Sequence, residues 1–187
     1  MVRAPAQSLS LEEFLQRPET KPASEYLDGS IIQKPMPKGK HSSIQGELTS
    51  FINAALRPRQ LARAFPELRC TFGGRSLVPD IAVLTWERIP RDADGTVANL
   101  VNIAPDWTIE ILSPDQRQSR VTQKILACLA GGTQLGWLID PDDLTILTYA
   151  PQQAPQFFDQ FDASLPVPAF ATELQIQLQD LRDCLFN

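Results

Sequence analysis

The sequence predicts one α/β domain over residues 1–187, with a central mixed β-sheet flanked by helices and a helix and hairpin at the N-terminal end. Two observations lead to this fold class. Segments with helical spacing and segments with strand composition follow one another without strict β-α alternation, which favours a mixed sheet over a parallel one. The length of 187 residues also suits one domain with a sizeable core.

The first elements are indicated by capping and turn residues. Ser10 can cap a short helix while Glu13, three residues on, reaches back to the cap, and this helix must end before Pro18. The segment SEYLDGSIIQK then predicts a hairpin that turns at Asp28 and Gly29. A loop is expected over residues 34–40, which are rich in Pro, Gly and Lys.

Two longer helices are predicted further along the chain. Residues 41–56 have apolar side chains at i, i+4, i+7 and i+8, and residues 119–130 are followed by two glycines that are typical of a helix end. Strands are expected over residues 68–72, 77–84, 107–112 and 137–140, edge strands over 145–150 and 156–161, and a terminal turn or helix over 174–181. The runs IAVL and WTIEIL are nearly all apolar, as in strands that are covered on both faces.

Composition limits the classes of protein to which the chain can belong. No apolar run approaches the about 18 residues of a membrane span, and the N-terminus has no apolar region typical of a signal peptide. The three cysteines, Cys70, Cys128 and Cys184, are scattered, which favours free thiols in a reducing compartment. A cytoplasmic protein is therefore expected. The net charge of −5 argues against a nucleic-acid coat protein, although local basic clusters leave nuclease chemistry open.

Two acidic residues stand in segments that are otherwise apolar. Asp80 opens the predicted strand PDIAVL, and Glu110 lies between two isoleucines in WTIEIL. A buried carboxylate is costly unless it is paired or binds a cation. Two carboxylates on neighbouring strands would repel each other, and a divalent ion such as Mg²⁺, which takes oxygen ligands and keeps several waters, would relieve that repulsion.

Lys124 is a third candidate. It shares a face of the second predicted long helix with Val121, Ile125 and Cys128, so its side chain leaves from the inward side. An ammonium group there could stabilise charge on a phosphate or orient an attacking water.

Simpler interpretations of these three residues stay open. Asp80 follows a proline and could cap a turn. Glu110 could form a salt bridge with a buried Lys or Arg, or face water at a sheet edge. Lys124 could lay its apolar stem on the core and hold its ammonium in water.

The ordered set of segments LEEFLQRPE, EYLDGSIIQKPMP, VPDIAVL, APDWTIEILSPDQR, the helix with Lys124, GWLIDP and LRDCLF resembles the Uma-type proteins, which are restriction-endonuclease-like members of the PD-(D/E)XK superfamily. This resemblance covers nearly the whole chain. It implies a restriction-endonuclease-like core and a metal-dependent phosphodiesterase site, in which Asp80 and Glu110 match the two acidic positions.

Further site residues follow from the same resemblance. Glu25 matches an acidic position that would supply a third metal ligand, while His41 and, more weakly, Glu47 are candidates near the substrate. The superfamily's usual lysine position holds Leu112, and the Uma-type lysine falls on Lys124. The helix departs from the Uma-type pattern at Cys128, where a tyrosine is usual.

Two functions are consistent with these observations. The first is an endonuclease that depends on Mg²⁺ or Mn²⁺ and hydrolyses nucleic acid, with DNA as the expected substrate, Asp80, Glu110 and Lys124 as catalytic residues, and Asp80, Glu110 and Glu25 as metal ligands. A homodimer is expected for cleavage of both strands, because one site cuts one strand. The second is a catalytically weak or inactive nuclease-fold module that binds nucleic acid or a protein partner.

Overall fold

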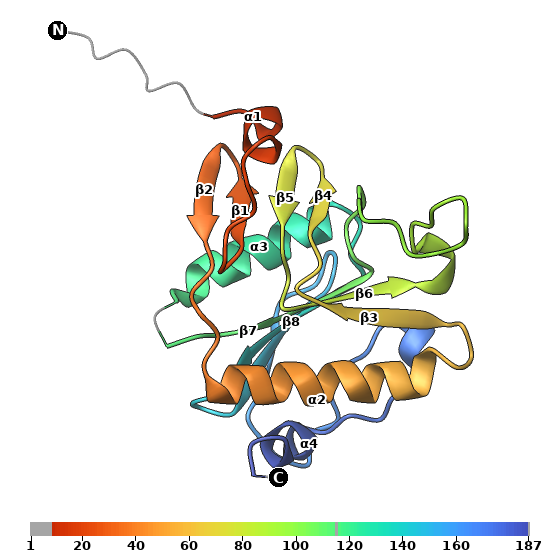
Figure 1. Ribbon diagram of the computed structural model, residues 1–187. Coiled ribbons are helices and arrows are strands. Elements are labelled where there is room, and N and C mark those ends of the chain that lie inside the picture. Colours follow the sequence, from red (N-terminus) through yellow and green to blue (C-terminus); the bar gives the residue numbers. More distant parts are fainter. Residues whose placement is uncertain (1–8, 115, 187) are drawn as a thin grey trace, which may run out of the picture.

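A six-stranded mixed sheet, which runs across the middle of Figure 1, forms the centre of the fold. The computed structural model describes residues 9–114 and 116–186. The strand order is β10-β9-β8-β7-β6-β3. The strands are β3 (Ala62–Pro66), β6 (Ile81–Thr85), β7 (Trp107–Ile111), β8 (Leu135–Asp140), β9 (Thr145–Tyr149) and β10 (Gln156–Phe158). Only β7 and β8 pair in parallel, and the crossover between them contains the helix α3 (Gln118–Ala130).

A second sheet of four short antiparallel strands lies beside the first, with the order β2-β1-β5-β4. Its strands are β1 (Ser24–Leu27), β2 (Ser30–Gln33), β4 (Cys70–Phe72) and β5 (Arg75–Leu77). The predicted hairpin is confirmed as β1 and β2, and both Asp28 and Gly29 have the positive φ that its tight turn requires. The helix α1 (Leu11–Leu15) begins with the predicted capping box, and Phe14 packs on Tyr26 of this sheet.

The two longer helices cover opposite faces of the large sheet (Figure 1). The apolar face of α2 (Gly39–Leu56) packs in the main core, which includes Trp107 and Trp137 from β7 and β8. The helix α3 packs on both sheets: Ile125 contacts the face of the large sheet around Leu138, while Cys128 belongs to a cluster with β1 and β5. A short C-terminal helix, α4 (Leu178–Asp183), packs against the main core. The predicted mixed sheet flanked by helices is therefore confirmed.

The structure differs from the sequence-based expectation in several strands, one of which is β9: it was expected at a sheet edge but pairs with both β8 and β10. The expected strand over residues 77–84 is interrupted, because Leu77 ends β5 in the small sheet and Ile81 begins β6 in the large one. Pro79 has no N–H for a strand ladder, and the amide of Val78 donates to the Glu25 side chain instead. In addition, β3 was not expected, because its short sequence ARAFP contains alanines, a charge and a proline.

Other expectations concern single residues and membrane helices. Cys70 and Cys128 are buried free thiols, as predicted, and Cys184 is a partly buried one. Among the helices in the described part of the chain, none has the length and apolar character that a membrane crossing requires.

Candidate active site

The candidate site lies at residues 78–80, where the chain passes from the small sheet to the large one. Asp80 directly precedes β6, and Ile81 pairs with Ile109 of β7 in the antiparallel ladder. Continuing that register by one residue places Asp80 opposite Glu110, so the two side chains leave the same face of the sheet. The strand break therefore brings an acidic residue to the edge of β7, beside the small sheet and the helix α3.

The Asp80 carboxylate is buried and makes three contacts. One oxygen, Oδ1, lies 2.7 Å from Lys34 Nζ. The other, Oδ2, accepts a 2.7 Å hydrogen bond from the amide of Ile111 and lies 3.2 Å from His41 Nε2. Burial disfavours the charged carboxylate, but Lys34 and His41 outweigh burial and hold the pKa of Asp80 well below its ordinary value. The bonds run to another strand and to α2, so Asp80 does not act as a local turn cap.

Glu110 is paired with Lys124, whose ammonium bridges two carboxylates. Lys124 Nζ lies 2.8 Å from Glu110 Oε2 and 2.9 Å from Glu25 Oε1, and Glu25 also accepts the Val78 amide at 2.8 Å. Burial, which is opposed by Lys124 and assisted by the negative charge of Asp80, raises the pKa of Glu110 to about 8. Burial opposes the charged form of Lys124, but Glu110 and Glu25 raise the pKa of this lysine above its ordinary value.

These contacts decide between the interpretations that the sequence left open. Lys124 is only 5% exposed, and its ammonium contacts carboxylates, so it does not extend into water. Glu110 does form the buried salt bridge, and its partner is the predicted catalytic lysine itself. Its second oxygen, Oε1, is buried and has no hydrogen-bond partner in the described part of the chain.

Sequence reasoning missed Lys34, which begins the segment 34–40 for which the sequence predicts a loop. Its ammonium lies 2.7 Å from Asp80 Oδ1, 2.8 Å from Glu67 Oε1 and 3.0 Å from the carbonyl oxygen of Val78. The amide of Lys34 donates to Ala23, which extends the hairpin by one pair beyond β2. The sequence did hold a signal. Successive side chains of a strand point to opposite faces, so a strand that continues to residue 34 places Lys34 on the same face as Ile32.

The residues present suit a hard divalent ion with Asp80 and Glu110 as its ligands, whereas Glu25 is less available as a third. Continuation of the β6–β7 register places Asp80 opposite Glu110, and Oε1 of Glu110, which has no hydrogen-bond partner among the described residues, is an oxygen of the type that Mg²⁺ binds. Over residues 9–114 and 116–186, no three acidic, histidine or cysteine side chains are already grouped as ligands of one ion. Glu25 is held by Lys124 and the Val78 amide, so its predicted part as a third ligand stays a prediction.

Two hollows reach this cluster, and Lys34 and Pro35 line both of them. One, of about 350 Å³, is lined by Lys124 together with Arg117 and Arg120 from the start of α3. The other, of about 490 Å³, is lined by residues that include Asp80 and His41. A ligand in the first hollow therefore meets basic side chains, and a ligand in the second meets the Asp80 carboxylate.

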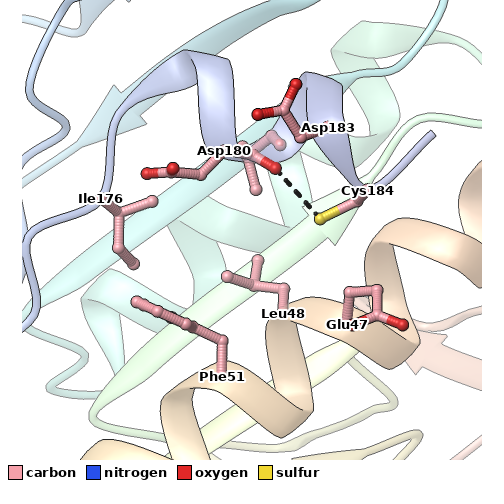
Figure 2. A pocket seen from close by; sticks show the side chains of 8 residues that line it. Glu47, Leu48, Phe51, Ile176, Asp180, Asp183 and Cys184 are labelled. Carbon is pink, nitrogen blue, oxygen red and sulfur yellow. Dashed lines mark hydrogen bonds between the residues drawn. The ribbon is translucent and has the colours of Figure 1, made fainter. Parts of the chain in front are cut away.

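Glu47 lies elsewhere. It lines a hollow of about 330 Å³ between α2 and α4, together with apolar side chains and the acidic residues Asp180 and Asp183 (Figure 2). None of the residues that line this hollow belongs to the cluster around Asp80 and Glu110. The structure thus brings together Glu25, His41, Asp80, Glu110 and Lys124 and leaves Glu47 apart.

Comparison with known proteins agrees with this architecture. The model of a family described as Uma2, putative restriction endonuclease, matches residues 11–179. The chain is also similar to the crystal structure of a putative nuclease belonging to DUF820 from Anabaena variabilis ATCC 29413. The two chains are 60% identical, the alignment covers 95% of this chain and 99% of the other, and the TM-score is 0.94. No curated protein sequence matches the chain.

Proposed function

The chain belongs to the Uma2 family of putative restriction endonucleases, and from this premise we propose that it hydrolyses phosphodiester bonds of DNA in a reaction that depends on Mg²⁺ or Mn²⁺. One observation carries the proposal. Asp80, Glu110 and Lys124 come from three different elements and meet at one buried junction that two hollows reach. Burial of several charged side chains costs desolvation free energy, and such clusters of perturbed ionisable groups are typical of functional sites.

Asp80 and Glu110 are the residues that would hold the ion. When bound, a divalent ion supplies a Lewis acid for a phosphoryl oxygen and lowers the pKa of a water. The chain's own contribution is to keep the Asp80 carboxylate charged and oriented, through the amide of Ile111 and through Lys34 and His41. Glu110 Oε2 accepts a hydrogen bond from Lys124, which leaves Oε1 to contact the ion.

Lys124 is proposed as the catalytic cation. Lys124 lines the basic hollow and its ammonium is held by Glu110 and Glu25, so its position is set before a substrate arrives. A positioned cation of this kind offsets charge that grows on the phosphoryl oxygens in the transition state. Glu25 then acts by orienting Lys124, whether or not it also contacts the ion.

Arg117 and Arg120 supply positive charge near the site, which the binding of a polyanion requires. Both are exposed and line the hollow, and within the described part of the chain neither forms a salt bridge. Two exposed guanidinium groups beside the site can bind backbone phosphates even though the whole chain has a net charge of −5. Cutting both strands of a duplex would require two copies, so we expect a homodimer on the substrate.

A second candidate is a module that binds nucleic acid or a protein partner without cutting. It is favoured by one observation, because both Asp80 and Glu110 already contact a lysine and are neutralised without an ion. The two functions differ in what a divalent ion does: the nuclease requires it, and the module does not.

The test is cleavage of supercoiled plasmid and of labelled DNA and RNA, with Mg²⁺, with Mn²⁺ and with EDTA. We expect cleavage by the wild type with either ion, none with EDTA, and none by Asp80→Asn or Glu110→Gln. Glu47→Gln is the matched control, because it makes the same acid-to-amide change in the separate hollow of Figure 2. Cleavage that survives in Asp80→Asn and Glu110→Gln would refute the assignment of the site, and absence of cleavage by the wild type on all substrates would favour the binding module.

A further inference from the structure

Lys34 occupies a position among oxygen atoms that resembles the environment of a bound metal ion. Two carboxylate oxygens and one backbone carbonyl oxygen, from Asp80, Glu67 and Val78, lie 2.7, 2.8 and 3.0 Å from its Nζ. Hard divalent ions take the same ligand types. Lys34 is 8% exposed, so the ammonium group takes the place of a solvent shell around the buried Asp80 carboxylate.

We propose that Lys34 is a built-in counter-cation that a divalent ion must displace from Asp80. The proposal rests on the metal site of the proposed function and adds a residue that regulates its occupation. An ion that binds Asp80 meets the positive charge of an ammonium 2.7 Å from the same carboxylate, and the two cations repel each other. Lys34 therefore weakens divalent-ion binding while it keeps the ion-free protein folded.

The two lysines of the site differ in how firmly they are held. Lys124 extends from the middle of α3 and lies between two buried carboxylates, Glu110 and Glu25. Lys34 lies at the end of the hairpin, directly after β2, and one of its two carboxylate partners, Glu67, has a side chain that is 43% exposed. Lys34 also lines both hollows, so its ammonium can turn into either of them when it leaves Asp80.

This arrangement has a consequence for substrate binding. When the ammonium turns into a hollow, it enters the space where a backbone phosphate would bind. The positive charge of Lys34, no longer paired with Asp80, can then form an ion pair with that phosphate. Ion binding and phosphate binding should for this reason favour each other, because each stabilises the displaced position of Lys34.

The experiment measures Mn²⁺ binding by calorimetry in the full-length wild type, Lys34→Met and Lys40→Met. Lys40→Met is the control, because it removes a lysine whose ion pair with Asp142 is exposed and lies outside the site. We expect Lys34→Met to bind Mn²⁺ at least about tenfold more tightly than the wild type, and Lys40→Met to bind as the wild type does. Lys34→Arg, which keeps the charge, should bind no more tightly than the wild type.

Thermal unfolding provides a second measurement. Lys34→Met should unfold at a lower temperature than the wild type in EDTA, and Mn²⁺ should raise its unfolding temperature by more than it raises that of the wild type. If Lys34→Met does not fold in EDTA, Lys34→Gln takes its place, because the neutral amide can still donate to Asp80 and Glu67. The same tightening is expected of it.

Unchanged or weaker Mn²⁺ binding in a folded neutral variant would overturn the proposal, and so would Mn²⁺ binding by none of the proteins. The outcome is separable from that of the proposed nuclease function. Tighter binding in the neutral variants supports the role of Lys34 even if the wild type cuts no DNA. Ion-dependent cleavage by a wild type whose Mn²⁺ affinity does not respond to Lys34 removes this inference alone.

Discussion

Replacement of Lys124 by methionine tests how the site is held together. Methionine keeps a long apolar stem and removes the ammonium that bridges Glu110 and Glu25. Both carboxylates are 2% exposed, so the change leaves buried acidic groups without their cation. Removing one partner of a buried ion pair costs about 3–5 kcal/mol. For a chain of this size, a loss of that order lowers the melting temperature by roughly 6–20 °C.

The assay is urea and thermal unfolding followed by tryptophan fluorescence, since Trp107 and Trp137 are fully buried and pack edge-to-face in the core. Lys40→Met is the matched control: its exposed ion pair is expected to contribute less than about 1 kcal/mol. Adding Glu25→Gln to Lys124→Met should recover part of the loss, because the amide oxygen can still accept the Val78 N–H without a charge. We expect a coupling of about 0.5–3 kcal/mol between the two sites.

A Lys124→Met protein as stable as the wild type would refute this reasoning. It would mean that the cluster relaxes or takes in water and that the lysine does not neutralise the two carboxylates. The result also sets the conditions for the activity test. Cleavage rates of Lys124→Met, expected to fall by about 10²–10³ for a positioned charge, must be measured below its own unfolding temperature.

Further predictions concern the scaffold and the assembly. Gly136→Ala should destabilise the protein by about 1–3 kcal/mol, because the new Cβ would lie 2.3 Å from Ile125 Cγ2. Gly46→Ala, which has open space around it in α2, should instead stabilise the protein by up to about 1 kcal/mol. Urea unfolding measures both changes. Asp106→Ala should cost about 1.5–3 kcal/mol in the same assay, because the buried carboxylate accepts the amide and hydroxyl of Thr85. Sedimentation velocity with a DNA duplex should show two protein copies, and a strictly monomeric complex would contradict the expected homodimer.

The sequence by itself determined much of the fold and identified three charged residues that the structure brings together in the candidate site. Asp80 and Glu110 were recognisable as candidates because a buried carboxylate in an apolar run requires a partner, and Lys124 because helical spacing places it on an inward face. Ser10 and the Asp28–Gly29 turn were equally readable, since capping and turn chemistry depend on residues within a few positions of one another.

Only the tertiary structure decided which charges meet and where the sheets divide. Lys34 lies 46 positions from Asp80 in the sequence, and Glu25 lies 53 positions from Val78. Hydrophobic periodicity describes neighbours within one element, so it does not predict contacts between residues so far apart. The break at Pro79 was missed because apolar residues stand both before Pro79 and after Asp80, so two strands of different sheets looked like one. Hydrophobic spacing reports which face of an element is buried, whereas the partner across the core is chosen by how the whole chain packs. For this reason the acidic residues of the site could be found from the sequence, but the lysine beside Asp80 could not.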